Sequence, residues 1–361
     1  MIENFSFFGA TDMGRVRTNN EDTFVCQTVW DADHLLCVAI DGVGGYDGGE
    51  VAAEMARSTI VDYVNRYPAT DDACLDVLKQ AVVEANNAIV QQKRAEGQYP
   101  HMSCVLTAGL FDIARMQLNV VHVGDTRLYQ YAGGELRKLT HDHSLVGFRE
   151  EQGELTEEEA MRHPQRNLIE RCVGEEMHML DDRNFMESGI FPIPANAHFV
   201  FCTDGLTDMV TSGDIRRVLD TEGSVERRAH QLIAAANDRG GRDNVTVVVV
   251  ETKGTDDAVA DATHPTAVAA AAETDVPQPA SSSCRRRRRG LPLLLCLLVG
   301  VAVGAGGASW WWQRYCDGRQ QTHDNIVKEL NTKMQWQERT ITELQETNVQ
   351  LTDSINKLQT E

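Results

Sequence analysis

One uncharged stretch near the end of the chain divides the sequence into parts that must fold by different rules. The 22 residues from Leu291 to Trp312 contain no charged side chain. As a helix they would span about 33 Å, enough to cross a bilayer core of about 30 Å. Five arginines precede the stretch and three tryptophans close it. Because basic residues favour the cytoplasmic side and tryptophans the interface, we predict a transmembrane helix within 285–312. A buried core helix is the alternative interpretation.

This helix would divide the chain into four regions. Residues 1–253 have the composition of a globular domain, and residues 254–284, rich in Ala, Thr, Asp and Pro, read as a disordered linker. The positive-inside rule places the globular domain in the cytoplasm and the C-terminus outside, with the protein crossing the cell inner membrane once. The opening segment "MIENFSFFGATDMG" lacks the basic and apolar regions of a secretory signal peptide.

The last region, 313–361, carries a heptad pattern. Eight of its ten core positions over five heptads are apolar, the exceptions being Gln337 and Asn348. This pattern predicts an extracytoplasmic coiled coil, most simply a parallel homodimer in which Asn348 fixes the register. An amphipathic helix that packs on another protein remains the alternative, because charge pairs are sparse beside the core positions. A third idea is that this region senses a signal outside the cell.

Charge and cysteine usage exclude several classes of function. The formal charge of −20 argues against sequence-independent nucleic-acid binding, which needs a basic face. None of the nine cysteines forms a C-x-x-C pair, so a zinc knuckle or a dithiol redox motif is not indicated. Most cysteines lie in apolar runs and read as small core residues in a reducing compartment.

Within residues 1–253, short apolar strands flank two groups of helices. This order predicts an α+β fold with antiparallel sheets rather than a parallel doubly wound sheet. The predicted strands are Phe5–Ala10, Thr23–Val29, Leu35–Ile40, Cys104–Phe111, Gln117–Val123, Leu128–Tyr131, His198–Thr203 and Asn244–Glu251. The predicted helices are Glu50–Arg66, Asp72–Ala95, Glu157–Arg162, Ser212–Asp220 and Val225–Asp238.

Acidic residues stand at the tips of several predicted strands. Asp41 follows a buried strand and opens a glycine-rich loop, and four further aspartates and a glutamate take similar positions: Glu21, Asp22, Asp125, Asp204 and Asp243. For any one of them a turn or cap role is the simpler interpretation. As a set they would converge and repel one another unless cations lay between them. Carboxylate-rich, histidine-poor sites select Mg²⁺ or Mn²⁺. A metal pair of His141 and His143 is a weaker alternative.

The order of these motifs resembles the bacterial branch of the metal-dependent protein phosphatase 2C family. The resemblance rests on "VRTNNED", "DGVGGYDGGE", "VGDTRLY", "LTHDHSLV", "HPQRNLIERCVG", "CTDGLTD" and "DNVTVVVV", which together extend from Gly9 to about Glu251. It implies two stacked antiparallel β-sheets flanked by helices, an α-β-β-α sandwich. It also implies hydrolysis of phosphoserine and phosphothreonine in proteins, in opposition to a Ser/Thr kinase.

The resemblance further implies a role for each matching residue. Asp41 would bridge two Mn²⁺ or Mg²⁺ ions, with one ion also bound by the Gly42 carbonyl. Asp204 and Asp243 would complete the shell of the second ion, and Asp125 with Asp204 would hold a possible third. Asp22, with Glu21 nearby, would orient metal-bound water. Arg17 would grip the substrate phosphate, and the segment from Ser144 to Gly174 would form a flap beside the site.

Three residues depart from the family pattern. Val43 stands where eukaryotic relatives have a histidine and bacterial relatives usually a methionine, and Val43 cannot donate a proton. Ser103 and Cys104 replace the usual Gly-Thr-Thr run, which could disturb the sheet near the metals. These departures keep a second hypothesis open, in which the chain is a catalytically weak phosphatase-like scaffold or a phosphoprotein-binding membrane protein.

Overall fold

The computed structural model describes residues 4–43, 48–69, 73–96, 99–182 and 184–254. All of them fall within the first of the two units into which the chain divides, Met1–His264. Apart from Gly254, the predicted linker, transmembrane helix and coiled coil lie outside the described residues. Among the helices that the structure does describe, none has both the length and the apolar character needed to cross a bilayer.

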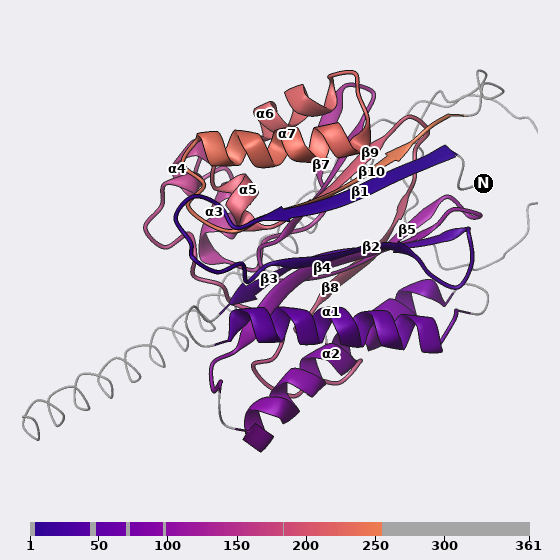
Figure 1. The fold of residues 1–361 in the computed structure, drawn as a ribbon, viewed down its shortest axis with the longest axis vertical. Coiled ribbons are helices and arrows are strands. Elements are labelled where there is room, and N and C mark those ends of the chain that lie inside the picture. The colour runs from indigo at the N-terminus through magenta and orange to yellow at the C-terminus, as the bar shows by residue number, and fades with distance from the viewer. Residues whose placement is uncertain (1–3, 44–47, 70–72, 97–98, 183, 255–361) are drawn as a thin grey trace, which may run out of the picture. The chain divides into compact units, whose positions relative to one another are not determined.

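Two five-stranded sheets form the centre of the domain (Figure 1). Every pair of neighbouring strands in them is antiparallel. The first sheet has, in spatial order, β1 (Phe5–Asp12), β10 (Val245–Thr252), β9 (His198–Cys202), β6 (Arg127–Ala132) and β7 (Glu135–Lys138). The second has β2 (Thr23–Thr28), β3 (His34–Val43), β4 (Ser103–Asp112), β5 (Gln117–Val123) and β8 (Glu187–Pro192).

Helices cover the outer face of each sheet, so the layers run α-β-β-α (Figure 1). The second sheet packs against the long helices α1 (Gly49–Arg66) and α2 (Cys74–Glu96). The first sheet packs against α5 (Asp204–Thr207), α6 (Ser212–Leu219) and α7 (Val225–Asp238). Two short helices, α3 (Leu145–Glu151) and α4 (Glu157–Met161), lie in the segment between β7 and β8. The predicted sandwich of two stacked antiparallel sheets is therefore confirmed for this domain.

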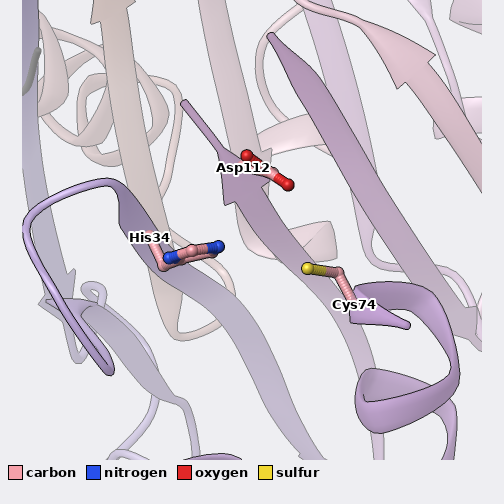
Figure 2. Close-up of side chains that lie close together, drawn as sticks. All are labelled: His34, Cys74 and Asp112. Carbon is pink, nitrogen blue, oxygen red and sulfur yellow. The ribbon is translucent and has the colours of Figure 1, made fainter. Parts of the chain in front are cut away.

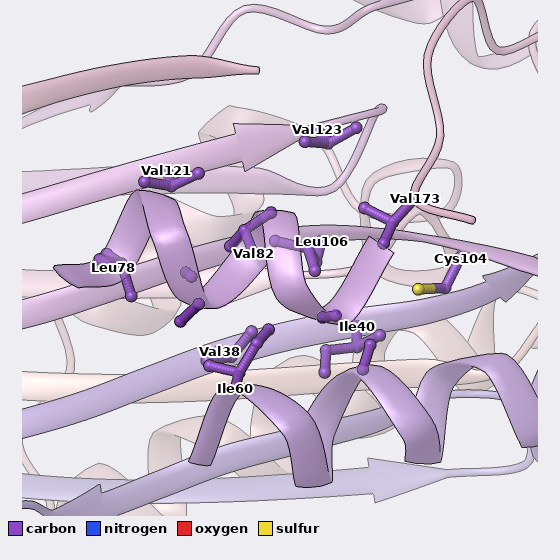
Figure 3. Packing of buried hydrophobic residues seen from close by; sticks show 14 of the residues in the cluster. Val38, Ile40, Ile60, Leu78, Val82, Cys104, Leu106, Val121, Val123 and Val173 are labelled. Atoms are coloured by element: carbon purple, nitrogen blue, oxygen red, sulfur yellow. The ribbon is translucent and has the colours of Figure 1, made fainter. Parts of the chain in front are cut away.

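The central strand β3 shows how sequence alternation builds this arrangement. Its residues Leu36, Val38 and Ile40 belong to the core shared with α1 and α2, where they meet Ile60 and Leu78 (Figure 3). The intervening residues on β3, Leu35, Cys37 and Ala39, face the other way into the core between the sheets. Because successive side chains on a strand point to opposite faces, a continuous apolar run serves two cores at once.

The structure differs from the predicted secondary structure in the end of one strand and in several missed elements. We predicted that the strand ends at Ile40, but β3 stays paired with β4 through Val43, so Asp41 lies inside the ladder rather than in the turn. The strands β7 and β8 and the helices α3 and α5 were not predicted. Both missed strands lie at sheet edges and are only partly buried, which weakens the apolar pattern that identifies a strand.

Candidate metal and phosphate site

Strand ends from both sheets bring the predicted acidic residues together. Asp41 lies on β3, on the face that Cys37 and Ala39 direct between the sheets. Asp125 follows the end of β5 by two residues, and Asp243 precedes β10 by two. Asp204 is the first residue of α5, immediately after β9 and its following threonine. Side chains that are 200 residues apart in sequence thus share one end of the sandwich.

These residues line one cavity of about 150 Å³, which is room for several water molecules or hydrated ions. All the predicted site residues except Asp22 contribute to its wall: Arg17, Glu21, Asp41, Gly42, Asp125, Asp204 and Asp243. Val43 and Asn244 line it too, as do Asn167 and Ile169 from the predicted flap segment. The prediction that the strand-tip carboxylates converge is therefore supported by their geometry.

Two glycines allow the backbone to approach closely around the cavity. A Cβ on Gly42 would lie 2.4 Å from the Gly49 carbonyl oxygen and 2.6 Å from that of Glu21. A Cβ on Gly205 would lie 1.9 Å from the Asn244 carbonyl oxygen. Both contacts are with backbone atoms, which cannot move aside as a side chain can. Glycine is therefore required where β3 meets α1 and where Asp204 meets the start of β10.

Burial and mutual repulsion raise the pKa of the central carboxylates. The pKa of Asp41 lies well above its usual value, first because burial disfavours its charged form and then because Asp22, Asp204, Asp125 and Asp243 repel its charge. The pKa of Asp204 is raised in the same way, by burial and then chiefly by Asp125 and Asp208. A set of acids that resist ionisation in this way becomes stable in its charged form when cations lie between them.

Asp22 and Asp125 share this environment but differ in their neighbours. Burial raises the pKa of Asp22 to about 7, against hydrogen bonds that favour its charged form, among them one of 2.8 Å from the Thr203 hydroxyl to Oδ2. Asp22 also neighbours Asp41 without lining the cavity. Burial raises the pKa of Asp125 to about 7 as well, with repulsion from Asp142 added. The position of Asp22 behind Asp41 suits the predicted orienting role.

Arg17 and Asn244 connect the loop that carries Arg17 to the residues at the start of β10. The Arg17 guanidinium donates to Asp243 Oδ2 over 2.7 Å, and the Arg17 side chain is 42% exposed. Asn244 accepts a hydrogen bond from the Glu21 backbone N–H and donates to the backbone carbonyls of Met13 and Asn19. Asn244 therefore holds the Arg17 loop against the start of β10. Its position in "DNVTVVVV" next to Asp243 was the only sequence signal for it.

The residues present fit a site for divalent cations. Asp204 Oδ1 is buried and has no hydrogen-bond partner among the described residues, an arrangement that costs free energy unless a cation binds there. The other acidic residues of the cavity wall offer carboxylate oxygens, and Gly42 offers a backbone carbonyl oxygen. An all-oxygen set of this kind suits Mg²⁺ or Mn²⁺ rather than zinc.

The weaker alternative, a metal pair of His141 and His143, is not what the structure brings together. His141 is exposed and its Nδ1 lies 2.8 Å from Glu187 Oε1. His143 instead packs on His122, with ring centroids 4.9 Å apart, and its Nδ1 accepts from the Gly124 backbone N–H. Both ring nitrogens of His122 are already engaged, with the Thr107 hydroxyl and the His141 carbonyl. This cluster therefore supports the loop after β5.

The residues that depart from the family pattern take different places. Val43 pairs with Ser103 at the end of the β3–β4 ladder and lines the cavity. Cys104 pairs with Gly42 but is fully buried in the core on the helix side of the sheet. Its backbone also bridges to Val173, which ties down the end of the flap segment. Of these three residues, therefore, Val43 alone lines the cavity.

Comparisons with known proteins agree with this geometry. The family model described as "Protein phosphatase 2C" matches residues 14–240. The serine/threonine phosphatase stp of Listeria welshimeri is 34% identical over 243 residues, which cover 67% of this chain and 93% of that protein. A crystal structure of the Mycobacterium tuberculosis serine/threonine phosphatase PstP superposes with a TM-score of 0.60 at 33% identity, covering 69% of this chain and 99% of that one.

A further PstP structure shows what such a site holds in a relative. It is the catalytic domain of that serine/threonine phosphatase in complex with two manganese ions, with a TM-score of 0.59 and 32% identity over 69% of this chain and 99% of that one. The likeness thus covers about two thirds of this chain and almost all of that catalytic domain. The chain therefore belongs to the protein phosphatase 2C family, as a protein serine/threonine phosphatase of the bacterial type.

Proposed function

We propose that this chain is a membrane-anchored, Mn²⁺- or Mg²⁺-dependent phosphatase that hydrolyses phosphoserine and phosphothreonine in proteins and so opposes a Ser/Thr kinase. The observation that carries the catalytic part is the cavity that aspartates from both sheets line together with Arg17. Buried like charges favour cations, and an arginine at the rim favours a phosphate, so the two features together suit phosphate ester hydrolysis.

Four groups of this chain would hold two ions. Asp41, the Gly42 carbonyl, Asp204 and Asp243 would be their ligands, and all four residues line the cavity. Asp125, whose charge repels that of Asp204, would share a possible third ion with it. The two manganese ions of the PstP structure support this assignment. Bound divalent ions supply an activated water and neutralise charge on the phosphate.

The remaining residues would bind the substrate and manage protons. Arg17 presents a planar guanidinium that can exchange Asp243 for two phosphate oxygens. Asp22, held at Oδ2 by the Thr203 hydroxyl, would orient the attacking water from behind Asp41. Val43 has no proton to give, so the leaving alcohol would take its proton from water or from another side chain. Asn167 and Ile169 from the flap would contact the substrate beside the phosphate.

The membrane part of the proposal rests on the sequence beyond the described residues. The uncharged run from Leu291 to Trp312, with five arginines before it, would anchor the chain in the cell inner membrane with the catalytic domain in the cytoplasm. The linker of residues 254–284 would give that domain reach towards its substrates. The heptads of residues 313–361 would join two chains in parallel outside the cell.

The second candidate, a phosphatase-like scaffold, has one observation in its favour. Val43 lines the cavity, at the position where the family resemblance would place a methionine or a histidine. A site of this kind could hold metal ions and a phosphoprotein without releasing phosphate efficiently. The full set of acidic side chains around the cavity favours the enzyme, because a binding protein would not need so many buried charges.

The deciding experiment measures Mn²⁺-dependent phosphate release from a phosphothreonine peptide by the purified full chain. We expect activity that EDTA removes and Mn²⁺ restores. The exposed acidic residue Asp62 on α1 provides a matched control, because Asp62→Asn makes the same chemical change far from the cavity. A wild-type chain that is folded and binds Mn²⁺ but releases no phosphate would favour the scaffold. Membrane fractionation of cells, with and without residues 285–312, tests the anchor separately.

A further inference from the structure

A second group of potential metal ligands lies away from the aspartate cavity. His34 on β3, Cys74 at the start of α2 and Asp112 on β4 place one ligand atom each within 4.8 Å of the other two. Figure 2 shows the Cys74 sulfur directed towards the His34 ring, with the Asp112 carboxylate beside them. His34 and Asp112 are direct partners in the antiparallel ladder, so the sheet itself fixes their separation.

His34 is oriented by a carboxylate in the way that metal-binding histidines are. Its Nδ1 lies 2.8 Å from Asp31 Oδ1, and its ring packs on Trp30 with centroids 4.8 Å apart. A carboxylate can only accept, so the ring hydrogen lies on Nδ1 and the lone pair of the neutral ring lies on Nε2. A carboxylate partner of this kind both fixes the ring and strengthens it as a ligand.

The other two ligands are buried and held. Asp112 is only 2% exposed, and its two oxygens accept hydrogen bonds from the Arg115 backbone N–H (3.0 Å) and guanidinium (2.9 Å). Each carboxylate oxygen keeps a second lone pair for an ion. Cys74 is 4% exposed and begins α2 directly above the sheet. The three side chains therefore come from elements whose positions are fixed by core packing.

We propose that His34, Cys74 and Asp112 form a binding site for Zn²⁺, with a water molecule in the fourth position. A thiolate, an imidazole and a carboxylate make the mixed ligand set that zinc prefers, whereas Mg²⁺ and Mn²⁺ prefer oxygen alone. One thiolate and one carboxylate together neutralise the charge of a divalent ion. The positive charge of Arg115 and the negative charge of Asp31, which flank the site, offset each other. The ion would clamp the start of α2 to the β3–β4 ladder.

Cobalt substitution in the full chain tests this proposal, because a thiolate-to-cobalt charge-transfer band reports sulfur ligation and is blind to an all-oxygen site. We expect metal-stripped protein to develop the band with one Co²⁺ per chain and to lose it when Zn²⁺ is added. Cys74→Ser should abolish the band. Cys26→Ser, which removes one thiol of the cross-strand pair Cys26–Cys37, should retain it. A wild-type chain without the band, or an unchanged band in Cys74→Ser, would overturn the proposal.

A second variant keeps the test valid if Cys74→Ser fails to fold. The Asp31 side chain is 60% exposed and outside the sheet ladders, so Asp31→Asn should leave the fold intact. Loss of an orienting carboxylate typically weakens metal binding about 10- to 100-fold. We therefore expect the cobalt affinity read from the band to fall by that factor. The same affinity in wild type and Asp31→Asn would contradict the assignment of His34 as a ligand.

Discussion

The two ends of the β3–β4 ladder carry different chemistry on opposite faces of one sheet. At one end, Asp41 faces the space between the sheets and joins a set of carboxylates that line one cavity. At the other, His34 and Asp112 face the helix side, where they meet Cys74. His34 and Asp41 are separated by seven residue steps, which span about 24 Å on a strand, and because seven is odd their side chains point to opposite faces.

This difference shows how one ladder can carry two different sets of metal ligands without mixing them. The Asp41 end gathers like charges that resist ionisation, so it depends on cations bound by oxygen. The His34 end combines sulfur, nitrogen and oxygen ligands and suits a single ion of another type. The two sets of side chains lie far apart along the ladder and on opposite faces of the sheet. A change at one end should therefore leave the other end unaffected.

The largest effect should come from removing a carboxylate at the Asp41 end. Metal-ion catalysis is worth several kcal/mol, so Asp204→Asn should lower kcat for a phosphothreonine peptide by about a thousandfold or more. The thiolate-to-cobalt band at the His34 end should be unchanged in the same variant. Asp62→Asn, the exposed control, should behave as wild type in both assays. Loss of the cobalt band in Asp204→Asn would show that the two ends are coupled.

A smaller effect should follow from removing the guanidinium at the cavity rim. Arg17 is the residue at this end that can bind a phosphate bidentately, so Arg17→Ala should lower kcat/KM about 10- to 100-fold, mainly through KM. Arg17→Lys should recover only part of the loss, because an ammonium cannot form the same fork. Arg57→Ala removes an exposed arginine of α1 and serves as the control. An effect on kcat alone would assign Arg17 to the chemical step instead.

The sequence predicted that the carboxylates at the Asp41 end converge, but it gave no indication of the ligand set at the His34 end. Acidic residues after apolar strands are a visible pattern, and the family motifs assign each of them a role. His34, Cys74 and Asp112 carry no such signal, because their meeting depends on strand register and on where α2 begins. Single residues from three elements form no local motif, so only the packed structure brings them together.

The same contrast applies to the fold. Buried strands such as β3, β4 and β10 were predicted to within a few residues because their apolar runs are continuous. The edge strand β7, "ELRK", alternates exposed charges with half-buried residues and was missed. The extension of β3 past Ile40 was missed as well, since "DGV" favours a turn unless a partner strand pairs with it.

The stability of the metal-free chain should depend on pH through the acidic residues at the Asp41 end. In the metal-free chain, the pKa values of Asp22 and Asp125 are about 7, above the usual value of 3.8. Between these values the folded state binds more protons than the unfolded state, so the free energy of unfolding falls as pH rises. We expect the Tm of EDTA-treated protein to drop by about 5 °C between roughly pH 5.5 and pH 8. Mn²⁺ should reduce the drop.

The variant Asp125→Asn checks the origin of this pH dependence. It removes one of the two raised pKa values, so the Tm of the metal-free variant should fall less steeply over the same pH range. Differential scanning calorimetry of both proteins, with and without Mn²⁺, gives the comparison. Equal slopes in the two metal-free proteins would place the titrating groups elsewhere in the chain.

The smallest effect should come from a residue at the Asp41 end whose side chain points away from the cavity. Cys104 pairs with Gly42, next to Asp41, yet its side chain is buried against the helices (Figure 3). Cys104→Val keeps the side chain apolar and of similar size, so it should cost less than about 1.5 kcal/mol of stability. Phosphatase activity should stay within about threefold of wild type. A loss of activity as large as that in Asp204→Asn would mean that the helix-side core controls the cavity. Side-chain direction alone would then not keep the two ends of the ladder independent.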